Sequence, residues 1–310
     1  MTYSIVARDS ETGEMGVACQ SQAFAVGSSV PWALPGYGVI ATQSMGEPLY
    51  DDLGLDGLRA GLTAEEALRA LRSVDPYPER RQVAMVDGRG NFAVYTGTQC
   101  VAQAGHLVGD GCAAQANMAA SDAVWPAMVA AYEQTSGALA PRLMAALHAA
   151  EEEGGDFRGR RSAAIAVVRA HRSGRPWRDE IVDLRVDDAA DPVGELDGMV
   201  RHSERYHRMV SAFEAAVDGD PKAGMAQLEH LEPVDVEGEP DMCAWKAVVL
   251  ALDGRSAQAR DLLDHLASTA PPFVELVRRF DAVGLLGDSL ALDGLLPPVA
   301  GHPSAGPPAD

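Results

Sequence analysis

The sequence changes its pattern once, at the acidic stretch 187–192, which ends in Pro192. Before this stretch, groups of short, apolar, β-prone segments alternate with segments whose apolar residues recur at helical spacing. After it, apolar residues recur only at helical spacing. Strand blocks separated by helix blocks are typical of layered sheets rather than of a regular parallel βαβ series. We therefore predict an α+β domain over residues 1–195 and an all-α domain over residues 196–296.

The sequence pattern of residues 1–195 predicts several strands and two pairs of helices. Strands are expected at Tyr3–Ala7, Met15–Gln20, Gly38–Gln43, Gln82–Asp87, Phe92–Thr96, Cys112–Asn117, Ser162–Arg169 and Ile181–Val186. Helices are expected from near Tyr50, after the N-cap Thr63, over Ala119–Tyr132 and over Leu139–Glu153. The segment Pro31–Gly36 is turn-rich, and His106 lies in a loop-like stretch.

Two motifs recur in the helical part. Ala216-Val217-Asp218-Gly219 returns as Ala251-Leu252-Asp253-Gly254, and Leu228-Glu229-His230-Leu231 returns as Leu263-Asp264-His265-Leu266, both at an offset of 35 residues. A period near 34 is typical of helix-turn-helix repeats of the tetratricopeptide (TPR) type, with Asp-Gly at the turn. Such folds need about three repeats, so we expect the first domain or a partner chain to cap the array. Residues 297–310 are rich in Pro, Gly and Ala and are predicted to be disordered.

Charge and cysteine content limit the partners. The chain has 45 acidic and 25 basic residues, a formal net charge of -20, which would repel phosphate backbones and anionic lipid. Neither a signal peptide nor a transmembrane run is present. The four cysteines are scattered, and Cys100, His106 and Cys112 match no common zinc spacing. We expect a cytoplasmic homo-oligomer that binds no nucleic acid, membrane, metal or cofactor.

Thr2 is the first candidate for catalysis. A small second residue lets Met1 be removed, which leaves Thr2 with both a hydroxyl and a free α-amine. An α-amine with a pKa of about 7.7 to 8.0 is matched to deprotonating that hydroxyl near neutral pH. The alternative is that a Met-Thr start reflects only strand and processing preferences. Ser4 and Ser21 rank lower because no Gly-x-Ser-x-Gly elbow surrounds them.

The segments Thr2–Asp9, Thr12–Ala18 and Phe24–Pro31 resemble the domain-of-unknown-function 1028 family. Further matches follow in the same order up to about Glu195, at Gly38–Gln43, Ala104–His106, Gln115–Met118, Gly154–Gly159, Ser162–Ala164 and Asp183–Asp188. The resemblance implies a four-layer αββα sandwich similar to N-terminal nucleophile (Ntn) hydrolases. It also implies a C-terminal helical extension, often labelled peptidoglycan-binding. The sequence departs from the family at Gln22, where a lysine is common, and this weakens transfer of a proteasome-like mechanism.

Polar residues in or beside apolar strands are the other site candidates. Asn117 could donate to an oxyanion or be a turn asparagine. His106 could be an acid/base group or a surface histidine. Asp156 and Arg158 could clamp a substrate or form an ion pair, and we favour the ion pair. The predicted catalytic residues are Thr2, Asn117 and His106, and the predicted substrate-binding residues are Ser4, Ser21, Thr42, Gln43, Asp156, Arg158 and Ser162.

Two functions follow from these residues. In the first, Thr2 attacks the carbonyl of a small-molecule amide, its own amine relays the proton, and water releases the acyl group. In the second, the sandwich is a catalytically inactive binding module, and the helical tail offers a concave surface to a protein or peptide.

Overall fold

The computed structural model describes residues 2–47, 49–229, 231, 238–286 and 294–297. Their contacts divide the chain into two compact units between Arg201 and His202. The segment predicted to be disordered lies outside the described residues, apart from Pro297. No helix in the described ranges combines the length and apolar character needed to cross a membrane.

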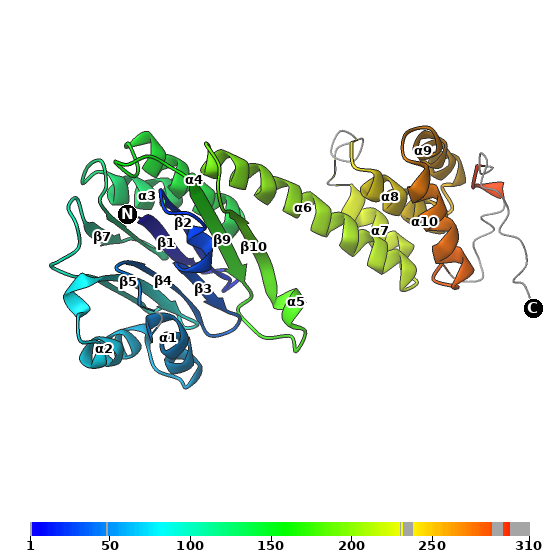
Figure 1. Ribbon diagram of the computed structural model, residues 1–310. Coiled ribbons are helices and arrows are strands. Elements are labelled where there is room, and N and C mark those ends of the chain that lie inside the picture. The colour runs from blue at the N-terminus through cyan, green and yellow to red at the C-terminus, as the bar shows by residue number, and fades with distance from the viewer. Residues whose placement is uncertain (1, 48, 230, 232–237, 287–293, 298–310) are drawn as a thin grey trace, which may run out of the picture. The chain divides into compact units, whose positions relative to one another are not determined.

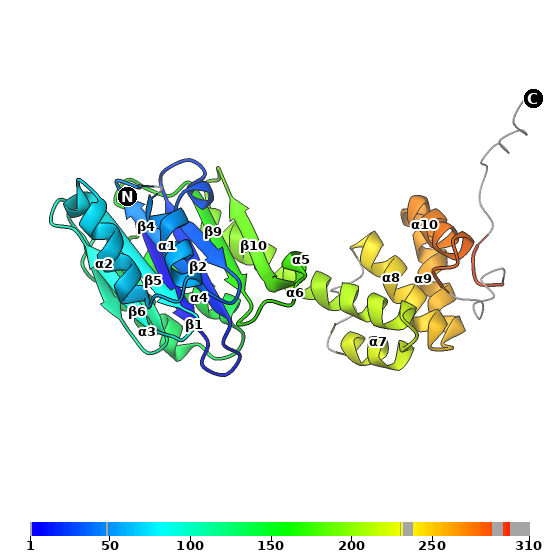
Figure 2. The same ribbon diagram turned by 90° about the horizontal axis from the view of Figure 1, so that it is seen from below.

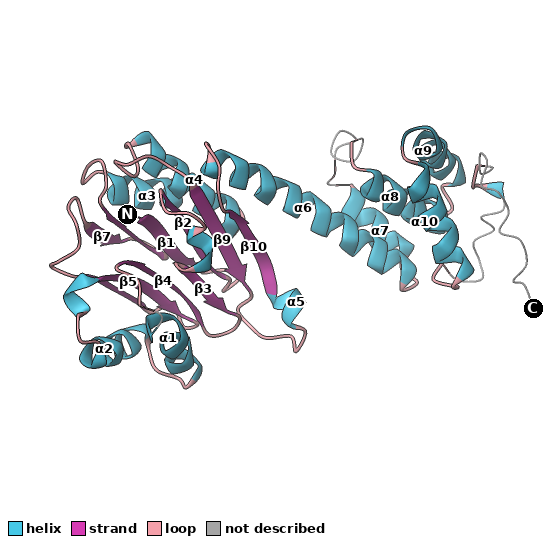
Figure 3. Ribbon diagram, in the orientation of Figure 1, coloured by secondary structure: helices cyan, strands magenta, loops and turns pink. Residues whose placement is uncertain are grey.

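The first unit contains two antiparallel sheets (Figures 1 and 3). The six-stranded sheet has the order β10-β9-β2-β1-β8-β7, with β1 inside it. Its strands are β1 (Thr2–Arg8), β2 (Met15–Ser21), β7 (Gly105–Val108), β8 (Cys112–Asn117), β9 (Ser162–Val168) and β10 (Glu180–Val186). The four-stranded sheet has the order β3-β4-β5-β6. Its strands are β3 (Pro31–Leu34), β4 (Gly38–Ser44), β5 (Arg81–Asp87) and β6 (Phe92–Thr96).

Helices cover the outer face of each sheet (Figures 1 and 2). The pair α3 (Val124–Gln134) and α4 (Leu139–Glu152) packs on the six-stranded sheet, and α1 (Leu49–Arg59) and α2 (Ala64–Val74) pack on the four-stranded sheet. The expected capping box begins α2, because Thr63 Oγ1 accepts a hydrogen bond from Glu66 N. Short helical turns lie at η1 (Val26–Ser28), η2 (Pro78–Arg80) and α5 (Pro176–Asp179). The prediction of layered α+β structure is confirmed.

Strand alternation separates two kinds of surface on β1. Tyr3 and Ile5 belong to the core under α3 and α4, whereas Val6 belongs to the core between the sheets. With a period of two, Thr2 and Ser4 lie on the same face as Val6. The antiparallel register puts the start of β1 beside the ends of β2 and β8, because Thr2 pairs with Asn117 and Tyr3 with Gln20. One end of the space between the sheets is therefore polar.

Three local predictions were wrong. The segment Pro31–Gly36 was expected to be a turn, but its first four residues form the edge strand β3, where a proline is tolerated. The loop expected around His106 is the edge strand β7, held by pairing with β8. The helix expected from Ala119 begins at Val124, because the Ala119 and Ala120 N–H groups bond to the carbonyls of Gln103 and Gly155 instead.

The described residues of the second unit form helices and turns, which agrees with the predicted helical region. The helix α6 (Pro192–Val217) begins in the first unit and ends in the second. It is followed by α7 (Pro221–Leu228), α8 (Pro240–Leu252), α9 (Ser256–Thr269) and α10 (Pro271–Ala282). The two Asp-Gly motifs lie in the turns between α6 and α7 and between α8 and α9, where Gly219 and Gly254 have φ of 98° and 81°. The motif leucines Leu228, Leu231, Leu263 and Leu266 are buried in the core of this unit.

Candidate functional site

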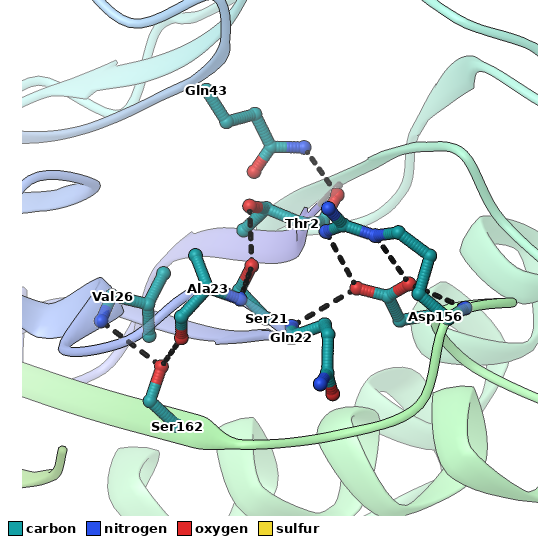
Figure 4. A network of polar contacts seen from close by, with 9 residues as sticks. Thr2, Ser21, Gln22, Ala23, Val26, Gln43, Asp156 and Ser162 are labelled. Carbon is teal, nitrogen blue, oxygen red and sulfur yellow. Dashed lines mark hydrogen bonds and ion pairs between the residues drawn. The ribbon is translucent and has the colours of Figure 1, made fainter. Parts of the chain in front are cut away.

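Thr2 is the first residue of β1, and only 6% of its surface is exposed. Its Oγ1 donates to Ser21 Oγ at 3.3 Å, and Ser21 Oγ also accepts from Ala23 N at 3.0 Å (Figure 4). A buried hydroxyl is thus held by a second hydroxyl on the neighbouring strand. Both residues were predicted site candidates, and the register between β1 and β2 brings them together.

Ser162 fixes the loop that follows Ser21. Its Oγ donates to the Ala23 carbonyl at 2.6 Å and accepts from Val26 N at 3.0 Å. Ser162 is the first residue of β9 and pairs with Ser21 across the β2–β9 ladder. The loop beside Thr2 is therefore tied to two strands by side chains buried from solvent.

The Asp156 carboxylate holds two backbone segments. It accepts hydrogen bonds from Gln22 N at 3.0 Å and from Arg158 N at 2.9 Å, and it pairs with Arg158 Nη2 at 3.1 Å. The ion pair that we favoured is present. The Gln22 side chain, in contrast, points away from Thr2 in Figure 4.

Asp156→Ala is expected to lower the free energy of unfolding of the first unit by about 2 kcal/mol, because it leaves two partly buried backbone donors unpaired. Asp122→Ala is the matched control, since Asp122 is exposed, and is expected to change stability by less than about 0.5 kcal/mol. Urea denaturation of both variants measures the difference. Equal stability of the two variants would show that the Asp156 contacts contribute nothing.

A network of buried amides joins the two sheets behind Thr2. Gln43 Nε2 donates to the Thr2 carbonyl at 2.9 Å and to Gln82 Oε1 at 2.8 Å. Gln43 Oε1 accepts from Ser4 Oγ at 2.7 Å, and Ser4 Oγ in turn accepts from Gln115 Nε2 at 3.2 Å. Buried polar groups in such a network rigidify their surroundings when they are satisfied. The network therefore fixes the backbone position of Thr2.

Asn117 lies directly opposite Thr2 in the β1–β8 pair. It is fully buried, and its Nδ2 donates to Gln82 Oε1 at 3.0 Å. Its Oδ1 has no hydrogen-bond partner among the described residues. Because an amide nitrogen carries two hydrogens, this contact uses one of the two N–H groups of Asn117.

Backbone strain collects at the same strand ends. The described residues include three non-glycine positions with positive φ: Ala25 at 53°, Ser44 at 75° and Met118 at 50°. Ser44 ends β4, Met118 follows the last residue of β8, and Ala25 belongs to the loop after β2. Such conformations cost about 1–3 kcal/mol each and cluster at functional sites. Their grouping around Thr2 supports a functional role for this end.

Two predicted site residues lie elsewhere. Thr42 precedes Gln43 on β4, and alternation turns it to the opposite face of the sheet. His106 is on the edge strand β7, where its Nδ1 lies 2.8 Å from Thr96 Oγ1. Partial desolvation lowers the pKa of His106, so the imidazole is neutral at neutral pH. Neither side chain joins the contacts of Thr2.

Among the described residues of the first unit, Thr2 lines neither of the following two cavities. The larger, of about 540 Å³, lies beside β6 and β7 and is lined by Thr96, Cys100, His106 and Trp125, among others. The smaller, of about 380 Å³, lies at the start of α1 and is lined by Ser28, Ser29, Trp32, Glu47, Asp51 and Asp52. Asp51 is 4% exposed, and burial, with Asp52 and Glu47 nearby, raises its pKa to about 8.

Asp51→Asn is expected to stabilise the first unit at alkaline pH. The folded-state pKa of about 8 lies above the usual value of about 3.9, so folding favours the protonated acid and the wild type loses stability as pH rises towards 8. The variant lacks this loss, so its melting temperature should exceed that of the wild type by several degrees above pH 8, with little difference near pH 4. Thermal unfolding at the two pH values measures the melting temperatures of the variant and the wild type. The same difference in melting temperature at both pH values would contradict this prediction.

The sequence interpretation missed two residues of the network. Gln82 Nε2 lies within hydrogen-bonding distance of Thr96 Oγ1 and of the carbonyls of Gly105 and Ala116. Gln115 Nε2 donates to the Ala41 carbonyl at 3.0 Å. The available signal was a glutamine on the same strand face as apolar residues, with Ala84 and Val86 beside Gln82 and Ala113 beside Gln115.

Comparisons with known proteins agree on one family. The sequence model of the family described as "Family of unknown function (DUF1028)" matches residues 2–196. The crystal structure of a Silicibacter pomeroyi protein, described by the same family, aligns with a TM-score of 0.58 and 31% identity, covering 64% of this chain and 88% of that one. No curated protein shows significant similarity. The chain belongs to the DUF1028 family of unknown function.

Proposed function

We propose that the first unit is an N-terminal nucleophile hydrolase that cleaves a small amide or related C–N bond, with Thr2 as the nucleophile after removal of Met1. The observation that carries the proposal is the buried Thr2 hydroxyl, held at 3.3 Å from Ser21 Oγ at the start of an inner strand. Two facing sheets with helices on their outer faces are compatible with the four-layer αββα sandwich of such enzymes. The second unit is proposed to be a TPR-like array on the basis of its repeated Asp-Gly turns.

The proposed reaction begins when Thr2 Oγ1 attacks the carbonyl carbon and its proton moves to the Thr2 α-amine. A tetrahedral intermediate forms and collapses, the C–N bond breaks, and the leaving amine takes the proton from the α-ammonium group. The acyl group is now an ester of Thr2. Water then attacks the ester carbon, releases the carboxylic acid and returns a proton to Thr2 Oγ1.

The neighbouring residues act by positioning and by charge stabilisation. Ser21 orients the Thr2 hydroxyl, and Gln43 holds the Thr2 carbonyl. The remaining N–H of Asn117 is the proposed donor to the developing oxyanion. While Met1 is attached, the Thr2 nitrogen is a peptide nitrogen and cannot act as a base. Removal of Met1 is therefore the activating step of this mechanism.

The test combines intact mass with covalent labelling. Protein purified from cells is expected to lack Met1, and an amide-hydrolase electrophile is expected to label the hydroxyl or amine of Thr2 in a peptide map. Protein with an uncleaved tag ahead of Met1 supplies the control, because it keeps the Thr2 hydroxyl but holds the Thr2 nitrogen in a peptide bond, and it should remain unlabelled. Active protein that keeps Met1, or a label on another residue, would replace this proposal with the catalytically inactive binding module.

A further inference from the structure

The smaller cavity contains a buried acid without a partner. Asp51 is 4% exposed and lines the cavity from the first turn of α1. Among the described residues nothing hydrogen-bonds its Oδ1. Burying a carboxylate oxygen without a partner is unfavourable, and such atoms in a folded protein call for an explanation.

The neighbouring acids make this arrangement less favourable still. Glu47 and Asp52 line the same cavity, and both raise the pKa of Asp51 further. Arg81 approaches Glu47 at 3.6 Å, but its Nε and Nη2 bond to Asp75 and its Nη1 bonds to the Met45 carbonyl. Arg81 is therefore shared between Asp75 and Glu47, whereas Asp51 and Asp52 form no ion pair within the described ranges.

Stabilisation by the helix start does not account for Asp51. Acidic side chains in a first turn are favourable because they face the unpaired N–H groups there. In α2 this takes a visible form, since Glu66 Oε2 accepts from Thr63 N at 2.9 Å. Asp51 Oδ1 makes no such bond. Asp51 thus lines the cavity with one carboxylate oxygen closed to solvent and without a hydrogen bond among the described residues.

Trp32 adds a second feature that selects the ligand. It lines the cavity from β3. An indole ring attracts organic cations through its electron-rich face. In the described ranges, no group of three or more His, Cys, Asp or Glu is arranged to hold a metal ion. Carboxylates beside an indole suit an ammonium group that is attached to an apolar chain.

We propose that this cavity binds the ammonium group of a small primary amine, with Asp51 as its acceptor and Trp32 against its alkyl chain. A volume of about 380 Å³ is within the range of small-molecule sites. The ammonium group donates to the Asp51 carboxyl group where it lines the cavity, and its positive charge offsets the charges of Glu47 and Asp52. This site does not depend on Thr2 acting as a nucleophile.

Isothermal titration of the full chain with n-butylammonium chloride tests the proposal, with 1-butanol as the neutral ligand of equal length. Above pH 8 the amine, with a pKa close to that of lysine, is still cationic. We expect binding of the amine and at least about tenfold weaker binding of the alcohol. Asp51→Asn should weaken amine binding about tenfold or more, because it removes a charged hydrogen bond. Asp122→Asn removes one exposed acid and should bind like the wild type.

Three results would overturn the site: no heat with millimolar amine, equal binding of amine and alcohol, or full amine binding by Asp51→Asn. Magnesium chloride that binds in an Asp51-dependent manner, with no binding of the amine, would also overturn it in favour of a metal site. Circular dichroism of Asp51→Asn verifies folding, which removal of a buried charge should not impair. Thr2→Ala is expected to retain amine binding, so failure of the proposed hydrolase leaves this result unchanged.

Discussion

Thr2→Ala should abolish covalent labelling and lower amide hydrolysis by at least about 10³-fold, because it removes the attacking oxygen. Alanine is small enough at the second position for Met1 still to be removed. The variant therefore keeps the free α-amine and loses only the hydroxyl. The fold should persist, since the hydroxyl makes one long hydrogen bond, to Ser21 at 3.3 Å, and its loss should alter the free energy of unfolding by about 1 kcal/mol at most.

Thr2→Ser is the matched variant, because it retains both hydroxyl and amine. We expect it to keep measurable hydrolysis and labelling. The decisive comparison is the rate of labelling of Thr2→Ala and Thr2→Ser by the same probe, with intact mass confirming loss of Met1 in both. Undiminished hydrolysis by Thr2→Ala would move the chemistry to another residue.

Gln82→Ala is expected to lower the free energy of unfolding of the first unit by about 3 kcal/mol or more. The side chain is fully buried, and its Oε1 accepts from both Gln43 and Asn117. Its Nε2 also donates to backbone carbonyls of the facing sheet. Truncation leaves these partners buried and unpaired, at about 1–3 kcal/mol for each group that water does not reach. The loss is large because one amide connects both sheets.

The exposed Gln99 provides the control for this experiment. Its Oε1 accepts from Arg80 Nε at the surface, so Gln99→Ala should change stability by less than about 0.5 kcal/mol. Urea denaturation gives the free energy of unfolding of both variants. The dependence of that free energy on urea concentration is compared between them as well. Equal stability of Gln82→Ala and Gln99→Ala would mean that water takes over the hydrogen bonds of the Gln82 amide. The network would then contribute nothing to the stability of the two sheets.

Local pattern predicted most of the strands of the first unit. Phe92–Thr96 and Cys112–Asn117 have the expected bounds, because their apolar runs lie between clear turn residues. The edge strands β3 and β7 were missed for a physical reason. Each contains a residue unusual in strands, Pro31 or Gly105, and each is a strand only because the next strand along the chain pairs with it.

The candidate site was only partly predictable. Polar residues in apolar strands indicated Thr2, Ser21 and Ser162, which the structure brings into contact through the 22–26 loop. Gln43 and Thr42 show the limit of this reasoning. They are adjacent in sequence, and only the register of the sheets decides which of them faces inward. Asp51 was missed because an acid at the start of a helix resembles an ordinary dipole partner.

The buried start of β1 has a practical consequence for work with recombinant protein. An affinity tag fused ahead of Met1 would keep the Thr2 nitrogen in a peptide bond. It would also add residues directly before Thr2, whose surface is only 6% exposed. A tag joined after Asp310 leaves that nitrogen free to be liberated. On the mechanism proposed for Thr2, N-terminally tagged preparations are therefore expected to lack hydrolase activity.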